Sequence, residues 1–251
     1  MNLSGNTILI TGGTSGIGRA LAEVLHAKQN KVIIAGRHQL LLDEITKQNP
    51  GMVGLQLDVS DAESIRHFTT LVQERFPKLN VLINNAGISK PEDYAAAQVE
   101  TETALAILQT NIASVIQLTA ALLPLLKSQP QATLMATTSG LAFVPLPMSP
   151  TYSASKAFLH SWLEALRFQL RNTNVEVLEL IPPYVQTELG GPKQAVDPRA
   201  MPLADFTQEV VQLIGDNKLP KGEILVERVK PLRWAEKDGQ YEKLLSIFGS
   251  F

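Results

Sequence analysis

The 251-residue sequence predicts an α/β fold: a doubly wound, mostly parallel seven-stranded sheet with helices on both faces. Two observations carry this prediction. Short apolar segments alternate along the chain with longer segments whose apolar residues recur at helical spacing. Nearly every short segment is also a continuous apolar run, as expected for strands that are covered on both faces. No linker, repeat or low-complexity stretch divides the chain, so one domain over residues 1–251 is expected.

Each expected strand is brief, rich in β-branched residues and followed by a turn or a polar residue. The first stops at Gly12-Gly13, and the fourth runs into Asn84-Asn85. The expected strands cover 7–11, 31–35, 52–57, 81–83, 132–137, 175–181 and 223–226.

The expected helices lie between these strands, and each carries an apolar face. The first follows the glycine-rich turn, with Ile17, Leu21, Val24 and Leu25 at helical spacing. The expected helices cover 17–29, 38–48, 61–76, 101–126, 152–171 and 206–214. Right-handed crossovers then place helices on both faces of the sheet.

Composition excludes several classes of protein. The 22 basic and 24 acidic residues nearly cancel, so nothing indicates nucleic acid or an acidic membrane surface as a partner. The absence of cysteine excludes disulfides and thiol chemistry. No histidine pair has the spacing of helical metal ligands, so no metal is expected, and His160 is assigned to a helix surface or an interface. With no secretory pattern, and no apolar run approaching the ~20 residues of a bilayer span, we expect a soluble, cytoplasmic protein.

Tyr152 and Lys156 would share one face of the expected helix 152–171. A tyrosine has a pKa near ~10, and a neighbouring ammonium group favours the phenolate and so lowers that pKa. Such a tyrosine can donate a proton to a carbonyl oxygen or accept one from an alcohol. The pair alone is weak evidence, because many helices place these two residue types four apart by chance.

A glycine-rich turn, Gly12-Gly-Thr14-Ser15-Gly16-Ile17-Gly18, joins the first strand to the first helix. Glycines let the backbone approach a ligand closely, and the helix N-terminus offers free N–H groups to a phosphate. No Gly-Lys-Ser/Thr follows, which excludes the phosphate loop of NTPases. The alternative is a tight strand-to-helix turn without a ligand.

The residue after the second strand bears on the choice of dinucleotide. An acidic residue there would bind the ribose 2′-OH of NAD, but this chain has Arg37, which suits the 2′-phosphate of NADP. NADP is therefore expected as cofactor, with NAD as the alternative and a sheet-edge role for Arg37 also open. Asp58 and Val59 follow the third strand, where the Asp58 carboxylate can accept the adenine amino group or cap the next helix.

Five motifs in order along residues 5–228 resemble the short-chain dehydrogenase/reductase family, with its Rossmann-type fold. They are Thr11-Gly-Gly-Thr-Ser-Gly-Ile-Gly18, Asn84-Asn-Ala-Gly87, Asn111, Ser139 and Tyr152-Ser-Ala-Ser-Lys156. The segment 227–236 also resembles the DltE-type branch of this family.

The resemblance implies roles for individual residues. Tyr152 would be the acid/base, Ser139 would hydrogen-bond the substrate oxygen, and Lys156 would lower the pKa of Tyr152 and hold the nicotinamide ribose. Asn111 would position a water in a proton relay. Cofactor contacts are implied for the glycine turn, for Asn85, Ala86 and Gly87 near the adenine ribose, and for Pro182, Val185 and Thr187 near the nicotinamide. Pro183 stands where the family usually has glycine, which alters the backbone expected there.

These residues together predict an NAD(P)-dependent oxidoreductase that transfers hydride between nicotinamide and a carbonyl or alcohol substrate. The alternatives are a non-catalytic NAD(P)-sensing protein, which would have no need of the four catalytic residues, and an α/β interaction domain, which would not need the glycine turn. The apolar stretch 141–148, with Tyr184 and Leu189, favours an apolar substrate, unless these residues only pack.

Two segments are assigned from composition and apolar spacing. Residues 188–205 are rich in glycine, proline and polar residues and are expected to form a substrate lid, in which Lys193 or Arg199 binds an anion or is merely solvated. The tail 228–251 carries Leu244, Leu245, Ile247, Phe248 and Phe251 in an apolar stripe. It would fold onto its own domain or meet another subunit, and the resemblance implies a homodimer or homotetramer.

Overall fold

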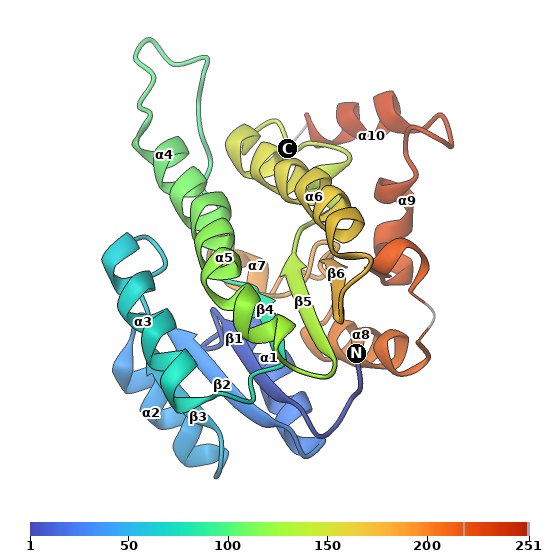
Figure 1. Cartoon of the computed structure of the whole chain (residues 1–251). Helices are drawn as coiled ribbons and strands as arrows, with labels where there is room; N and C mark the ends of the chain where they lie inside the picture. Colours follow the sequence, from blue (N-terminus) through green and yellow to red (C-terminus); the bar gives the residue numbers. More distant parts are fainter. Residues whose placement is uncertain (218, 250–251) are drawn as a thin grey trace.

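Seven parallel strands of the described chain form one sheet in the order β3-β2-β1-β4-β5-β6-β7 (Figure 1). The structure is a computed structural model that describes residues 1–217 and 219–249. The strands are β1 (Thr7–Thr11), β2 (Lys31–Gly36), β3 (Val53–Gln56), β4 (Val81–Asn84), β5 (Ala132–Thr137), β6 (Val175–Ile181) and β7 (Glu223–Leu225). Every pairing between neighbours is parallel, which confirms the doubly wound fold predicted from the sequence.

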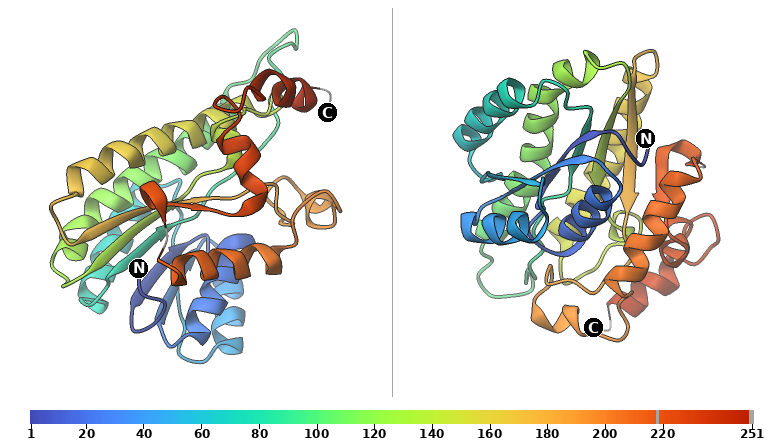
Figure 2. Two further views of the ribbon diagram at one scale, coloured as in Figure 1. Left: turned by 90° about the vertical axis from the view of Figure 1, so that its right-hand side faces the viewer. Right: turned by 90° about the horizontal axis from the view of Figure 1, so that it is seen from below.

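Helices cover both faces of this sheet and bury two separate apolar layers (Figure 2). One layer packs α1 (Gly16–Ala27), α2 (Gln39–Gln48) and α8 (Leu203–Gly215) against the sheet. The opposite layer packs α3 (Ala62–Arg75), α5 (Ser114–Lys127) and α6 (Pro150–Leu170). Because both faces are covered, consecutive residues of the central strands are all buried, which explains the continuous apolar runs.

The helical region predicted over 101–126 is divided in the structure. It consists of α4 (Glu102–Leu108), a π-helical segment η1 (Gln109–Ala113) and α5. Asn111 lies in the middle of the π-helical segment and is fully buried. Such insertions are rare and recur at functional sites, so this break in the helix marks Asn111 as a candidate functional residue.

The sequence-based statement that no apolar stretch approaches the length of a membrane span is wrong for this region. Residues 102–127 form one helical stretch of 26 residues, long and apolar enough by length and composition to cross a membrane. The buried side of α5 contributes Val115, Leu118, Leu122 and Leu126 to the apolar layer on the sheet. The stretch therefore has the packing of a core helix.

Short elements that the sequence did not predict lie in the part of the chain after β5. They are α7 (Pro192–Ala195), α9 (Lys230–Arg233), α10 (Tyr241–Phe248) and the 3-10 turns η2 (Gly140–Ala142), η3 (Pro220–Gly222) and η4 (Glu227–Val229). In the expected C-terminal stripe, Leu244, Leu245 and Phe248 are half-buried and Ile247 is exposed. Phe251 lies outside the described residues.

Candidate active site

A cavity of about 430 Å³ opens at the carboxyl ends of β1, β4, β5 and β6. The strand order reverses between β1 and β4, and the crevice at such a switch point is where doubly wound sheets bind ligands. The cavity brings together most of the predicted site residues: Gly12, Ser15, Gly16, Ile17, Asn85, Ala86, Gly87, Ser139, Tyr152, Lys156, Pro182, Val185 and Thr187. Its lining does not include the predicted residues Thr14, Gly18, Arg37, Asp58, Val59 and Asn111.

The glycine turn leaves room and donors for a phosphate at this cavity. Gly12 and Gly16 have φ of 65° and 51°, a region that side chains other than glycine rarely adopt. A Cβ on Gly18 would lie 2.3 Å from the main-chain oxygen of Gly12, so the turn closes only without that atom. Ser15 is the N-cap of α1, yet its side chain makes no capping hydrogen bond. The first N–H groups of α1 are thus available to an anion, and the turn fits a dinucleotide pyrophosphate.

The ends of β1, β4 and β5 are tied together by Asn85 and two threonines. The Thr11 hydroxyl oxygen accepts hydrogen bonds from the N–H groups of Asn85 at 3.0 Å and of Ala86 at 3.1 Å. The Asn85 side chain donates to the Thr11 main-chain oxygen at 3.2 Å and accepts from the Thr137 hydroxyl at 3.2 Å. These contacts hold the floor of the cavity in one arrangement.

The predicted adenosine contacts lie outside the cavity lining, on the surface at the ends of β2 and β3. Arg37 is exposed, and its positive charge contributes to lowering the pKa of Asp58, after the larger effect of the hydrogen bond from the Ser60 side chain. The alternative role of Asp58 as a helix cap is wrong. The N-cap of α3 is Asp61, whose carboxylate accepts from the N–H of Glu63 at 2.9 Å.

Tyr152 and Lys156 lie one turn apart on α6, and both are buried, with exposed fractions of 6% and 4%. Lys156 Nζ donates to the Thr137 main-chain oxygen at 2.8 Å and lies 5.6 Å from the centroid of the Tyr152 ring. Burial lowers the pKa of Lys156 to about 8. Lys156, which belongs to α6 like Tyr152, thus connects this helix to the end of β5.

The net pKa of Tyr152 lies above its ordinary value. Burial raises it to about 12, and the Ser139 side chain acts in the opposite direction. A phenolate needs solvation that the buried site does not supply, so the ring hydroxyl keeps its proton at neutral pH. The lowering by Lys156 that the resemblance implies stays a prediction, and Ser139 and Tyr152 both line the cavity.

Asn111 lies outside the cavity lining and is hydrogen-bonded to Ile88, which is part of it. Its side-chain oxygen accepts from the Ile88 N–H at 2.9 Å, and its amide donates to the Ile88 oxygen at 3.0 Å and to the Ser155 hydroxyl at 3.1 Å. Asn111 therefore fastens the loop after β4 to the helix that carries Tyr152. The water-positioning role implied for it stays a prediction.

The segment after β6 is folded across one side of the cavity. Val185 pairs with Met201 in an isolated parallel bridge. The Gln194 side chain donates to the Val185 oxygen at 2.8 Å and to the Thr187 hydroxyl at 3.1 Å. Arg199 is held by the Asp197 carboxylate at 2.8 Å, and its hydrogen bonds lower the pKa of Asp197 to about 2. Residues 188–205 thus include a short helix and fixed polar contacts, and their role as a lid stays a prediction.

Several cavity residues were not singled out from the sequence. They are Ile88, Ser89, Lys90, Glu188 and Gln194. They lie on the loops that follow β4 and β6. A general rule, that loops at the carboxyl ends of parallel strands line the ligand site, would have indicated them.

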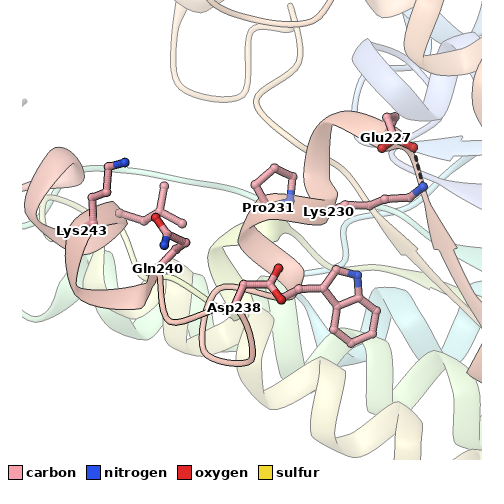
Figure 3. A pocket seen from close by; sticks show the side chains of 8 residues that line it. Glu227, Lys230, Pro231, Asp238, Gln240 and Lys243 are labelled. Atoms are coloured by element: carbon pink, nitrogen blue, oxygen red, sulfur yellow. Dashed lines mark hydrogen bonds and ion pairs between the residues drawn. The ribbon is translucent and has the colours of Figure 1, made fainter.

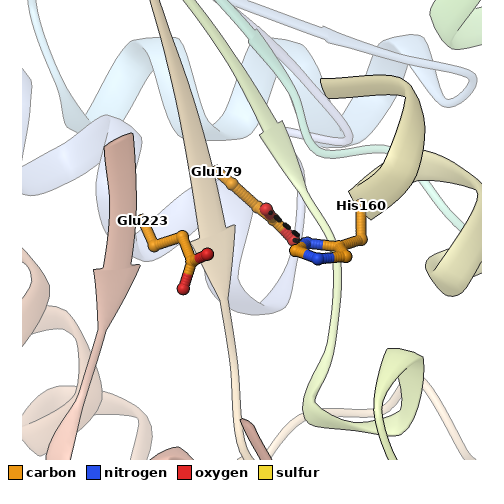
Figure 4. A group of neighbouring side chains, drawn as sticks. All are labelled: His160, Glu179 and Glu223. Carbon is orange, nitrogen blue, oxygen red and sulfur yellow. Dashed lines mark hydrogen bonds and ion pairs between the residues drawn. The ribbon is translucent and has the colours of Figure 1, made fainter. Parts of the chain in front are cut away.

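His160, Glu179 and Glu223 form a polar cluster (Figure 4), and the Thr138 hydroxyl after β5 donates to Glu179 at 2.7 Å. His160 does not lie on a free helix surface as expected, because its ring meets the fully buried Glu179 at 2.9 Å. His160, Glu179 and Glu223 each place one potential ligand atom within 4.8 Å of the others. Arg233 already donates to both carboxylate oxygens of Glu223, at 2.8 and 2.9 Å, so a guanidinium fills the role that a metal cation would have.

A second cavity, of about 380 Å³, lies on the C-terminal segment (Figure 3). It is lined by Glu227, Lys230, Pro231, Trp234, Asp238, Gln240, Lys243 and Leu244. Lys230 pairs with Glu227 at its rim. Its charges of both signs do not select a ligand class.

Comparisons with known proteins identify the family of this chain. The sequence profile described as short chain dehydrogenase matches residues 6–197. The uncharacterized oxidoreductase DltE of Bacillus subtilis is 40% identical over 246 residues, which cover 97% of this chain and 96% of that protein. The NADP-dependent 3-hydroxy acid dehydrogenase of Schizosaccharomyces pombe is 31% identical, over 78% of this chain and 79% of that protein.

Solved structures have the same fold. A short chain dehydrogenase from Burkholderia cenocepacia in complex with NADP aligns with a TM-score of 0.83 over 98% of this chain and 99% of that chain, at 23% identity. A short chain dehydrogenase/reductase from Burkholderia phymatum in complex with NAD aligns with a TM-score of 0.79 over 96% of both chains, at 22% identity. The extent of the profile match and the 40% identical relative establish that the chain belongs to the short-chain dehydrogenase/reductase family of oxidoreductases.

Proposed function

We propose that the chain is an NADP-preferring enzyme that interconverts a carbonyl compound and its alcohol. The observation that carries this proposal is that the Ser139 and Tyr152 hydroxyls and the buried ammonium group of Lys156 line one cavity, with Lys156 Nζ 5.6 Å from the centroid of the Tyr152 ring. Two hydroxyls at one point can both address a single substrate oxygen. A cavity with such donors beside a fitting dinucleotide turn supports hydride chemistry at the carbon of that oxygen.

The residues of this chain would supply the proton and the electrostatic stabilisation. The Ser139 and Tyr152 hydroxyls donate hydrogen bonds to the carbonyl oxygen and stabilise the negative charge that develops on it. Tyr152 then releases its proton to that oxygen, and the nearby Lys156 charge favours the phenolate as it forms. When bound, the nicotinamide cofactor supplies the hydride. Asn111 would help to return a proton to Tyr152 through water.

The pKa values favour the reducing direction at neutral pH. A pKa of about 12 leaves Tyr152 protonated and ready to donate, whereas alcohol oxidation would need the phenolate. Lys156, with a pKa of about 8, is mostly charged at pH 7.

The preference for NADP is supported by Arg37 at the end of β2. Its exposed guanidinium can reach a 2′-phosphate, and no acidic residue stands at this position to bind a ribose 2′-hydroxyl. The S. pombe relative is named as NADP-dependent. Within the proposed site the glycine turn, from Gly12 to Gly18, would hold the pyrophosphate.

The cavity favours a substrate with an apolar body. Ile88, Pro183 and Leu189 line it beside Ser139. The segment 188–205 would cover the substrate as a lid, with Gln194 fixing its near end to Val185 and Thr187. Lys90 and Glu188 add charges of opposite sign to the lining, so neither sign dominates the entrance.

The test is stopped-flow oxidation of NADPH against a panel of aldehydes and ketones. The wild type should reduce at least one member, and Tyr152→Phe should bind NADPH with unchanged affinity while losing turnover by a factor of about 10² or more. A wild type that binds NADPH and reduces nothing would favour the NAD(P)-sensing alternative. Turnover retained by Tyr152→Phe would refute the assignment of the acid.

We also propose that the protein assembles as a homodimer or homotetramer in the cytoplasm. Leu105 and Leu108 of α4, with Phe158 and Phe168 of α6, are large apolar side chains that are at least two-fifths exposed. Light scattering on the purified protein measures the assembly, and a monomer at micromolar concentration would contradict it.

A further inference from the structure

Two glutamates stand side by side on the adjacent strands β6 and β7. Glu179 and Glu223 are register partners, with exposed fractions of 0% and 2%. Removing a carboxylate from water costs several kcal/mol unless it is paired, so each glutamate needs a reason to be there. Arg233 accounts for Glu223, because it satisfies both carboxylate oxygens. Glu179 has different partners, and they lead to the active site.

Glu179 joins the two elements that carry the catalytic hydroxyls. Its Oε1 accepts a hydrogen bond from the Thr138 hydroxyl at 2.7 Å, and its Oε2 lies 2.9 Å from His160 Nδ1. Thr138 directly precedes Ser139, and His160 lies one turn after Lys156 on the helix of Tyr152. One buried carboxylate thus connects the turn after β5 with α6.

We propose that Glu179 is a positioning residue of the active site, which sets the separation of the Ser139 and Tyr152 hydroxyls by holding Thr138 and His160. The proposal rests on the proposed function, in which both hydroxyls address one oxygen. A displacement of about 1 Å in such a site can lower the rate about 10²-fold. The hydrogen bond from Lys156 to Thr137 also connects α6 with the end of β5, one helical turn nearer to Tyr152. Glu179 adds a second connection between these two elements, and two connections fix their relative orientation.

The charge of His160 supports this bridge. The charged groups around its ring are Glu179 on β6, Glu164 on α6, Arg233 on α9 and Glu223 on β7. The Phe143 ring packs edge-on at 4.7 Å. Burial lowers the pKa of His160, but the hydrogen bond and charge of Glu179, with Glu164, outweigh it and raise the pKa above its usual value. When His160 is protonated, its imidazolium balances Glu179 as Arg233 balances Glu223.

The sign of the resulting pH dependence follows from linkage. A histidine whose pKa is raised by folding stabilises the folded protein fully below its unfolded pKa of about 6.5. That contribution is lost as the pH rises through the raised, folded value. Replacing Glu179 by a neutral residue should remove it.

The experiment compares Glu179→Gln with Glu176→Gln, the same change on the same strand at a half-buried glutamate that pairs with the N-terminal amine. For each folded variant, NADPH affinity and the single-turnover rate of hydride transfer are measured with the best carbonyl of the panel. Glu179→Gln should slow transfer about ten- to a hundredfold with NADPH affinity unchanged, and Glu176→Gln should keep the wild-type rate. Thr138→Val removes the other end of the bridge and should show the same pattern if Glu179→Gln folds poorly.

A histidine NMR titration provides a readout that does not depend on turnover. The His160 pKa should fall in Glu179→Gln and stay unchanged in Glu176→Gln. Wild-type transfer rates in both Glu179→Gln and Thr138→Val, or an unchanged His160 pKa in Glu179→Gln, would overturn the proposal. If the wild type itself reduces no carbonyl, the proposed function fails, and the titration still decides whether the bridge exists.

Discussion

Lys156 Nζ donates a hydrogen bond of 2.8 Å to the main-chain oxygen of Thr137, so the charged end of the lysine is fixed to the last residue of β5. The contact places the ammonium group of Lys156 inside the protein near Tyr152. Burial there lowers the pKa of Lys156 to about 8. Keeping this lysine charged in the folded protein therefore lowers the free energy of unfolding, and this cost can be measured.

Lys156→Met should stabilise the ligand-free protein at pH 7. A shift of the lysine pKa from 10.5 to about 8 corresponds to roughly 3 kcal/mol, of which the lost hydrogen bond from the charged ammonium group to Thr137 offsets about 1.5 or more, so the expected net gain is about 1 kcal/mol. A depressed lysine pKa means that the penalty is complete below about pH 8 and fades as the pH rises toward 10.5. Urea unfolding at pH 7 and pH 9.5 should therefore show a gain that shrinks at the higher pH. The exposed Lys47→Met is the control, and an equal effect of both substitutions would contradict the prediction.

Carbonyl reduction should decline as the pH rises above about 8. Lys156 loses its proton in this range, and the phenolate that forms on Tyr152 then lacks its stabilising charge. The pKa of Tyr152, about 12, puts its own deprotonation beyond the measurable window. A profile of kcat from pH 6 to 10 with saturating NADPH tests this. A rate that stays level to pH 9.5 would show that the charge on Lys156 is not needed.

Arg37→Ala should weaken NADPH selectively. Hydrogen bonds to a charged group contribute about 1.5–3 kcal/mol, so the KM for NADPH should rise about ten- to a hundredfold while that for NADH stays nearly constant. Arg66→Ala, which removes an exposed arginine from α3, is the matched control. Equal use of both cofactors by the wild type, unchanged in Arg37→Ala, would reject the assignment.

Gly18→Ala should disable the dinucleotide turn. The added Cβ would lie 2.3 Å from the Gly12 oxygen and 2.4 Å from the Asn85 side-chain nitrogen, and neither can move without disturbing β1 or β4. We expect a loss of about 1–3 kcal/mol of stability and no measurable NADPH binding. Calorimetric titration with NADPH and thermal unfolding report the two effects. Gly249→Ala, where a Cβ meets only ordinary contacts beyond 3.4 Å, should change neither.

The sequence predicted the strands and long helices because buried parallel strands leave apolar runs and their crossover helices leave a clear period. Helices of four residues, such as α7 and α9, are too short to show any period, so they were missed. Asp61 rather than Asp58 caps α3, because the chain needs one more turn before the helix begins. That choice depends on local backbone geometry which the residue types alone do not fix.

The electrostatics of the site were harder to predict than its composition. The pKa of Tyr152 depends on how completely the ring is buried. The spacing of four residues between Tyr152 and Lys156 carries no information on burial. The cluster around Glu179 depends on the register of β6 against β7 and on the position of α9. Glu179, inside the otherwise mostly apolar run 175–181, was nevertheless a visible signal of a buried polar contact. Charged residues are rarely buried without a partner.

The close packing of α9 on the turn after β5 has a consequence for synthesis on the ribosome. A Cβ on Gly140 would lie 2.7 Å from a Leu232 side-chain atom and 2.9 Å from one of Val229. The turn that carries Ser139 and Gly140 is therefore packed directly against the segment 229–232. The nascent chain forms the glycine turn and the first strands early, whereas the support for Ser139 emerges only after Val229 and Leu232 have been synthesised. The polypeptide should therefore be able to capture a dinucleotide before it can perform chemistry with it.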